Sequence, residues 1–288
     1  MEKTNVKSAS SLEELKLCAM SFDSANSVPV YATSAKLRQK QYQGIWNVEK
    51  NKLCAIAGKD YNIIQHRDFV GETASALQRL NLRSSAKVRD SGDKVIVDIT
   101  FNDSKLFIQK GEEFYTGIRM INSYNKTTGV MILPHLVRLA CTNGMVMNIG
   151  WVKSFNVRHN SKMSKDFESI AKKIIDDMVN GNDKFKALVE SCLIDSVEWA
   201  ILDKILPVLF QTEKHREAIQ GILKQDGKDK VTRWDLYNAV TDYVSHSSSL
   251  SVGFDIALQN KAQQILVTPL ANLPKVEVEA EATTEEVV

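Results

Sequence analysis

The sequence predicts an α+β protein, in which a strand-rich mixed block with one or two helices is followed by a C-terminal helical region. Three observations predict this order. Apolar and polar residues alternate through much of residues 50–163, which is typical of half-buried strands. From about residue 164 the apolar residues recur every three or four positions, which is typical of amphipathic helices. The sequence shows no internal repeat at 20–50 residues, which argues against a solenoid.

Residues 1–49 are expected to be an N-terminal segment that is only partly helical. They are polar at first, and one short helical pattern covers residues 12–20. Residues 54–57 and 61–65 are expected to be the next two strands. Asp68 is a suitable N-cap for a helix that continues to Leu80.

Residues 50–163 are expected to form a basic, strand-rich α+β domain. The clearest strand covers residues 95–101, where apolar residues occupy every second position. Asn143-Gly144 and residues 125–129 are expected to be tight turns. Further strands are expected at residues 106–109, 114–123, 130–133, 137–141, 146–148 and 151–157.

Residues 164–268 are expected to form a helical region that packs on this domain. Ser164 is a suitable cap for the first helix, whose apolar face continues to Met178. Thr232 and Asp235 have the spacing of a capping box at the start of a later helix. Residues 269–288 are expected to be an acidic disordered tail. The other helices are expected at residues 184–193, 195–210, 212–224, 232–244 and 252–267.

The composition predicts a soluble globular protein. Hydrophobic residues make up 43% of the chain and charged residues 25%, which is enough to bury a core. No apolar run approaches the length of a spanning helix, and the N-terminus leads into no apolar segment, so we expect an intracellular protein. The four cysteines are far apart, which argues against a disulfide framework and a zinc site.

The charges are distributed unevenly along the chain. Residues 1–160 contain 22 Lys and Arg against 14 Asp and Glu, whereas the remainder contains 15 against 21. Residues 114–165 contain no acidic residue, although seven Lys and Arg occur there. A phosphate-binding surface must exclude acids, because each one repels the ligand. The alternative explanation for the missing acids is a buried sheet with few charges of either sign. This alternative does not account for the seven cations.

We expect these cations to form a nucleic-acid-binding face on the strands. Tyr124 is the best exposed candidate for stacking on a base, because it lies beside polar turn residues. Arg158 and His159 precede a helix start, whose backbone N–H groups favour phosphate. Trp151 and Phe155 can instead face the core, and Asn143-Gly144 can be purely structural. The candidate nucleic-acid-binding residues are Arg119, Tyr124, Lys126, Arg138, Asn143, Lys153, Arg158, His159 and Lys162.

No catalytic, metal-binding or cofactor-binding motif is found. The sequence lacks the Gly-rich loops that bind nucleotide phosphates, and its five histidines are not at metal-ligand spacing, so no cofactor and no metal are expected. Asp98 and Asp103 are better explained as turn and solvent-facing acids than as nuclease residues. Cys141 and His159 are candidates for a nucleophile and its base, but a small buried thiol is the simpler interpretation.

Four segments resemble the phage/plasmid-like protein family of unknown function. They are Asn122-Ser123-Tyr124, residues 138–145 with their R-x-x-C-x-N-G pattern, Arg158-His159, and residues 232–246. The last segment resembles the W-x-x-Y-N-A-x-T-E-Y-x-x-H helix of that family.

The resemblance covers roughly residues 50–250 and has two departures. Asn125-Lys126-Thr127 replaces the usual Asp-Gly, and Asp242 replaces the usual Glu. The resemblance implies a prophage, phage or plasmid protein in the cytoplasm of a bacterium or a phage-infected host. It implies no activity.

These observations predict a non-enzymatic protein that binds single-stranded DNA during replication, recombination or annealing, by analogy with phage annealing proteins. The acidic tail is expected to compete with nucleic acid or to recruit a host or phage replication protein. Homo-oligomers are compatible with the sequence, and no membrane partner is expected. One alternative is a protein–protein modulator of a host enzyme that binds no nucleic acid. The least favoured is a metal-dependent nuclease.

Overall fold

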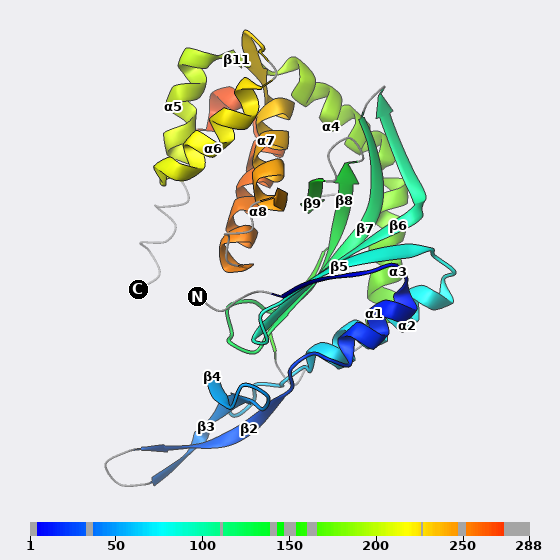
Figure 1. The fold of residues 1–288 in the computed structure, drawn as a ribbon, viewed down its shortest axis with the longest axis vertical. Coiled ribbons are helices and arrows are strands. Elements are labelled where there is room, and N and C mark those ends of the chain that lie inside the picture. Colours follow the sequence, from blue (N-terminus) through cyan, green and yellow to red (C-terminus); the bar gives the residue numbers. More distant parts are fainter. Residues whose placement is uncertain are drawn as a thin grey trace. The chain divides into compact units, whose positions relative to one another are not determined.

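The computed structural model has an α+β fold that is rich in strands in its first half and helical in its last part, as predicted (Figure 1). It describes residues 5–32, 37–109, 112–138, 143–146, 154–159, 166–225, 227–246 and 252–273. The chain divides into two compact units. The first comprises Met1–Leu106, Phe114–Val137 and Val146–Val179, and the second comprises Phe107–Glu113, Arg138–Met145 and Asn180–Val288.

The main sheet has the strand order β1-β5-β6-β7-β8-β10, and β9 pairs with β8. Alternate residues of β5 are buried, so that Val88 lies on a covered face and Lys87 on the other. The strands are β1 (Asn5–Ala9), β5 (Ser84–Asp90), β6 (Lys94–Gln109), β7 (Glu112–Ser123), β8 (Val130–Arg138), β9 (Asn143–Val146) and β10 (Phe155–Val157).

Two helices of the first unit pack on each other, and one of them also packs on the edge of the main sheet. The predicted helix near residue 12 is confirmed as α1 (Leu12–Ala19), which contacts β1, β5 and α2. Ser11 caps it, because its Oγ accepts a hydrogen bond from the Glu14 amide at 3.2 Å. The helix predicted from Asp68 is α2 (His66–Arg79), whose N-cap is Gln65. A third helix, α3 (Phe167–Asn180), follows the last strand of the main sheet.

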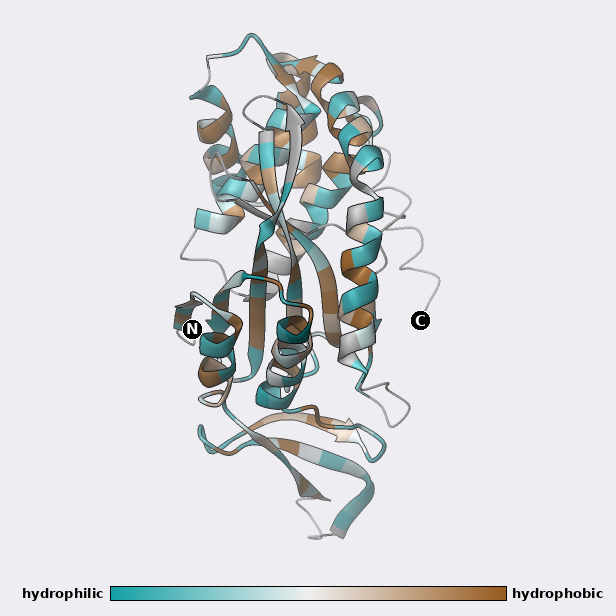
Figure 2. Cartoon of the chain, turned by 90° about the vertical axis from the view of Figure 1, so that its right-hand side faces the viewer, coloured by the Kyte–Doolittle hydropathy of each residue, from teal (hydrophilic) through white to brown (hydrophobic). Residues whose placement is uncertain are grey.

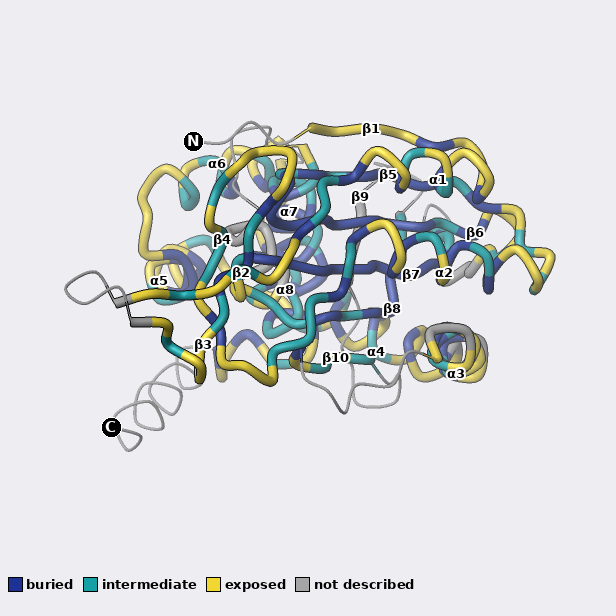
Figure 3. Tube along the Cα trace, turned by 90° about the horizontal axis from the view of Figure 1, so that it is seen from below, coloured by how far each residue is buried: buried dark blue, intermediate teal, exposed yellow. Residues whose placement is uncertain are grey.

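A second sheet contains three antiparallel strands, β2 (Ala25–Ala32), β3 (Leu37–Asn47) and β4 (Lys52–Gly58). Only β4 was predicted, because residues 25–47 mix Ser, Gln, Pro and Lys without regular alternation. We refer to it as the small sheet. Figure 3 shows β2 and β3 as largely exposed or intermediate, whereas most of β6 and β7 is buried.

The second unit is mainly helical. Its helix α7 packs against α4, α6 and α8, and the short strands β11 and β12 pair with each other. The predicted capping box is confirmed, because Asp235 N donates to Thr232 Oγ1 and Thr232 N donates to an Asp235 oxygen, both at 3.0 Å. The elements are α4 (Asn182–Ile194), β11 (Ser196–Glu198), α5 (Trp199–Leu209), α6 (Glu213–Lys224), β12 (Lys230–Thr232), α7 (Arg233–His246), α8 (Val252–Val267) and the 3-10 helix at Leu270–Asn272.

The hydropathy of the residues varies across each helix and strand in line with its packing. Figure 2 shows brown and teal residues side by side on the helices and strands, which is the amphipathic pattern that one-sided packing requires. None of the described helices combines the length and the apolar character needed to cross a membrane.

Several local predictions are wrong. Residues 61–65 form no strand, since their backbone leads into α2. Asn143-Gly144 lies in β9 and not in a turn. The two strands predicted within residues 130–141 are joined, because β8 continues through Pro134 to Arg138. The strands β1, β5, β11 and β12 were not predicted.

Candidate nucleic-acid interface

Arg119, the first predicted phosphate ligand, lies in β7 and is only 3% exposed. Its guanidinium donates two hydrogen bonds to Asp98 of β6, one from Nε and one from a terminal nitrogen at 2.9 Å. Arg89 of β5 donates to the same carboxylate at 3.2 Å. Burial alone would raise the pKa of Asp98, but Arg119, His135 and Arg89 together lower it below its usual range. Arg119 is therefore not a surface phosphate ligand, because an acid from a neighbouring strand neutralises it.

The prediction that Tyr124 is exposed is wrong, since only 1% of its surface is accessible. Its ring stacks on His66 with 3.8 Å between the ring centroids. Its hydroxyl accepts a hydrogen bond from the His66 amide at 2.9 Å and donates to the Asp23 carbonyl at 3.0 Å. Burial raises the pKa of this phenol. Tyr124 is thus a core residue that joins three segments of the first unit.

The other described candidates have different environments. Lys126 and Arg158 are exposed, and Lys126 Nζ donates to the Ile56 carbonyl of β4 at 3.0 Å. His159 is buried, stacks on Tyr61 and lies 3.1 Å from the Asn62 carbonyl through Nδ1. Burial lowers the pKa of His159, so the ring is neutral near pH 7 and contributes no positive charge to a phosphate site.

The remaining candidates cannot be placed. The backbones of Arg138 and Asn143 belong to β8 and β9, but their side chains lie outside the described residues. Lys153, Lys162, Cys141, Trp151 and residues 275–288 also lie outside them. Of the nine candidates, the described part of the chain therefore leaves two exposed cations.

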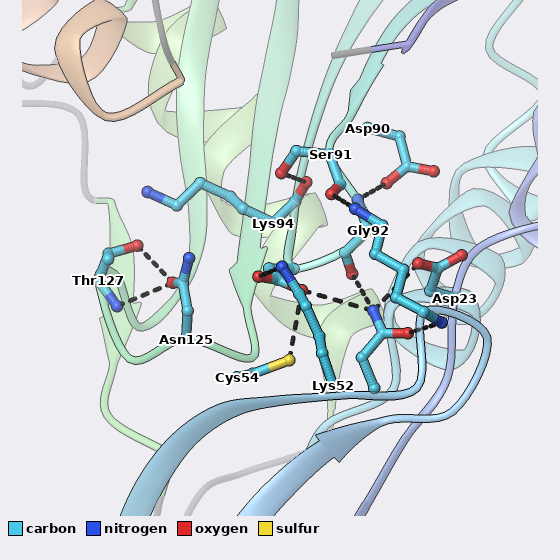
Figure 4. Close-up of polar contacts among 12 residues, drawn as sticks. Asp23, Lys52, Cys54, Asp90, Ser91, Gly92, Lys94, Asn125 and Thr127 are labelled. Atoms are coloured by element: carbon cyan, nitrogen blue, oxygen red, sulfur yellow. Dashed lines mark hydrogen bonds and ion pairs between the residues drawn. The ribbon is translucent and has the colours of Figure 1, made fainter. Parts of the chain in front are cut away.

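A polar cluster joins the turn between β5 and β6 to the small sheet (Figure 4). Asp93 in this turn accepts from Lys52 Nζ at 2.8 Å and from Cys54 Sγ at 3.3 Å. Asn47 of β3 donates to Asp23 at 3.0 Å. Burial and the neighbouring Asp93 raise the pKa of Cys54 to about 12, so the thiol stays protonated and donates. These contacts fix one side of the small sheet on the first unit.

The two faces of the small sheet have opposite environments. On the inner face, Ala25, Ile45 and Ala57 form a buried cluster with Tyr124. The alternate residues point the other way, and Tyr42, Leu53 and Ile56 are 48%, 48% and 49% exposed. With the half-buried Val28 and Trp46, they define what we name the outer patch: Val28, Tyr42, Trp46, Leu53 and Ile56.

Gly44 lies at the centre of the outer patch, opposite Val28 on β2 and Ile56 on β4. A Cβ atom at this position would lie 2.8 Å from Val28 Cγ2 and 2.9 Å from Leu53 Cδ1. A glycine therefore lets these two side chains meet over β3. The outer patch is a continuous apolar and aromatic surface of the kind that marks binding sites.

Four exposed cations lie toward the Tyr42 end of the outer patch, and none of them forms an ion pair with a described residue. They are Arg38, Lys40, Lys59 and Lys126. The strands β2, β3 and β4 contain no acidic residue. This arrangement of an exposed tyrosine, aliphatic side chains and cations without an ion-pair partner among the described residues is suited to a ligand with apolar faces and negative charges.

The two acids considered for catalysis are engaged in structural contacts. Asp103 pairs with Arg83 at the surface, and Asp98 is held by two guanidiniums. Within the described residues, no three His, Cys, Asp or Glu side chains gather as metal ligands do. Cys18, Cys54 and Cys192 are free thiols.

Sequence reasoning missed the outer patch, although the same signal was available there. Residues 25–48 contain no acidic residue, and they include Tyr31, Tyr42 and Trp46 among three cations. The longer acid-free stretch at 114–165 was instead predicted to be the binding surface. The cations within 25–48 are Lys36, Arg38 and Lys40.

Comparison with known proteins places the chain in a family but gives it no activity. No curated protein and no solved structure matches the chain significantly. One domain family, described as "Domain of unknown function (DUF932)", matches residues 54–269, which is most of the chain. The chain therefore belongs to the DUF932 family.

Proposed function

We propose that this protein binds single-stranded nucleic acid through the outer patch and the four cations at its Tyr42 end. The observation that carries the proposal is a partly exposed apolar sheet face with Tyr42 on it, no acid on its strands, and nearby cations that form no ion pair with any residue the structure describes. Exposed rings such as Tyr42 stack on bases regardless of sequence, and Lys and Arg neutralise the phosphates. The ligand is single-stranded, because only unpaired bases can present their faces to a sheet.

The biological setting of this binding is also a proposal. The resemblance of residues 122–124, 138–145, 158–159 and 232–246 to phage- and plasmid-borne proteins supports a role in DNA replication, recombination or annealing. In this role the protein acts as a binding protein and not as an enzyme.

The salt dependence of binding tests the proposal. Fluorescence anisotropy with oligo-dT at several salt concentrations should give a slope of log affinity against log salt of about −3, because four cations each release counterions at about 0.7 per phosphate. Affinity that does not change with salt, or no binding at low salt, would exclude the proposal.

Two sets of variants locate the site. Arg38→Glu with Lys40→Glu should weaken oligo-dT binding at least tenfold, whereas Lys172→Glu with Lys173→Glu makes the same charge change on exposed positions of α3 and should have little effect. Tyr42→Ala should cost about 1–3 kcal/mol of binding energy through lost stacking. Equal losses in the two double variants would show that net charge, and not this surface, governs binding.

A protein partner is the second candidate, favoured by the aliphatic exposure of Leu53 and Ile56. In that case the purified protein would carry no nucleic acid, seen as a low 260/280 absorbance ratio, and oligo-dT would not bind. Leu53→Ser with Ile56→Ser would then abolish the protein complex, while Arg38→Glu with Lys40→Glu would leave it largely intact.

A further inference from the structure

The strands β2 and β3 extend beyond the third strand of the small sheet. β4 pairs with β3 from Tyr42 to Asn47, whereas β2 pairs with β3 further out, as far as Ala32 and Leu37. Figure 1 shows this two-stranded part projecting past β4. We name it the arm and define it as residues 31–32 of β2 and 37–41 of β3.

A shift in the strand pairing marks the base of the arm. Pro29 of β2 lies opposite Gln43 of β3, but Tyr31 lies opposite Arg38, so several residues of β3 bulge out between these two pairs. A bulge bends the strand that contains it and increases its twist. The arm is therefore a distinct part of the hairpin and not a flat continuation of the outer patch.

The side chains of the arm are open to solvent. Arg38, Lys40 and Gln41 are all exposed, and Tyr31, directly across from Arg38, is 55% exposed. A two-stranded hairpin that buries so little surface has only marginal stability of its own in water. The arm thus presents a projecting ribbon that the described chain leaves available to a ligand.

The arm also divides the four cations of the proposed binding surface into two pairs. Arg38 and Lys40 lie on the arm. Lys59 directly follows β4, and Lys126 Nζ donates to a β4 carbonyl at 3.0 Å. Residues 25–48 contain no acidic residue, so the arm has no acid of its own to repel a polyanion. A nucleic acid that passes over both parts would contact one pair of cations on each.

We propose that the ligand is a duplex with a single-stranded extension, in which the arm enters the major groove of the duplex and the outer patch holds the extension. This inference rests on the proposed function, which assigns the single strand to the outer patch. The major groove is about 12 Å wide and admits a two-stranded β-ribbon, whose strands lie about 4.8 Å apart. Arg38 and Lys40 neutralise phosphates at the edges of the groove.

The test compares three ligands by fluorescence anisotropy: oligo-dT, a blunt duplex, and the same duplex with that oligo-dT as a single-stranded extension. The extended duplex should bind at least about tenfold more tightly than either of the others, because joining the two sections makes the second contact intramolecular. Its affinity should also fall more steeply with salt than that of oligo-dT, since more phosphates are neutralised.

A pair of variants places the duplex on the arm. Tyr31→Ser with Gln41→Ser changes arm residues that belong neither to the outer patch nor to the four cations. This variant should lose most of the tighter binding to the extended duplex and keep the wild-type affinity for oligo-dT. Leu17→Ser with Met20→Ser changes two exposed residues of α1 and should retain both affinities.

The outcomes separate this inference from the proposed function. If oligo-dT binds but the extended duplex binds no more tightly, the inference is overturned and the proposed function stands. If oligo-dT does not bind at all, both are overturned. If the arm variant still prefers the extended duplex as the wild type does, the duplex lies elsewhere and the inference is overturned.

Discussion

Arg119 on the main sheet and Lys40 on the small sheet are both cations on strands, but their surroundings differ completely. Arg119 is buried and pairs with Asp98, which lies on the neighbouring strand β6 and is 21 residues away in sequence. Lys40 is exposed and lies on a sheet whose three strands contain no acid. The comparison shows that the charge of a surface depends on which strands become neighbours. A stretch without acids in one strand does not make a basic face if the next strand supplies an acid.

The largest expected effect comes from removing the acid that pairs with the buried Arg119. Asp98→Asn leaves the guanidinium of Arg119 buried without its counter-charge, which should cost about 3–5 kcal/mol of unfolding free energy. Urea denaturation followed by circular dichroism measures it. Asp103→Asn breaks the exposed pair with Arg83 and should change stability little. Similar losses in the two variants would mean that burial does not distinguish the two pairs.

A smaller effect separates the buried Tyr124 from the exposed Tyr42. Tyr124→Phe removes the hydroxyl that accepts from the buried His66 amide, which should cost about 1–3 kcal/mol. Tyr42→Phe should leave stability unchanged, because the Tyr42 side chain is half exposed, and it should retain oligo-dT binding, because the stacking ring remains. Loss of stability in Tyr42→Phe would show that the outer patch is a structural surface.

A third effect concerns pH. Burial lowers the pKa of His66 to about 3, whereas the unfolded chain has a value near 6.5. Between these values the unfolded state binds a proton that the folded state does not, so stability falls as pH is lowered below about 6.5. The slope from this group is at most about 1.4 kcal/mol per pH unit. His66→Gln should flatten the dependence measured by urea denaturation between pH 6.5 and 4.5, and an unchanged slope would contradict the assignment.

The helices were predictable because their information is local. The capping box of Thr232 and Asp235 and the 3.6-residue apolar period lie within one or two turns, and the structure confirms the helices of residues 182–267 close to the predicted bounds. The alternation in residues 95–101 identified β6 for the same reason.

The surroundings of the predicted site residues depend on contacts between residues that are far apart in the sequence, and no local sequence pattern indicates such contacts. Tyr124 is buried by His66 and Asp23, which are 58 and 101 residues away in sequence. The strands β2 and β3 were missed because residues 25–47 show no regular apolar alternation, and few of their side chains, such as Ala25 and Ile45, pack with Tyr124. Small buried residues such as Ala25 and Ala57 differ little in hydropathy from their neighbours, so they do not indicate a strand.

Side chains bind backbone groups on both outer strands of the small sheet, β2 and β4. Gln65 binds the amide of Ala25 at 3.0 Å and its carbonyl at 2.7 Å, in the way that a further strand would. Lys126 occupies the Ile56 carbonyl on β4. Unpaired strand edges are templates for aggregation, and a charged lysine on an edge is one of the devices that prevent it. These contacts occupy part of each outer edge of the small sheet and so limit edge-to-edge pairing with further copies there.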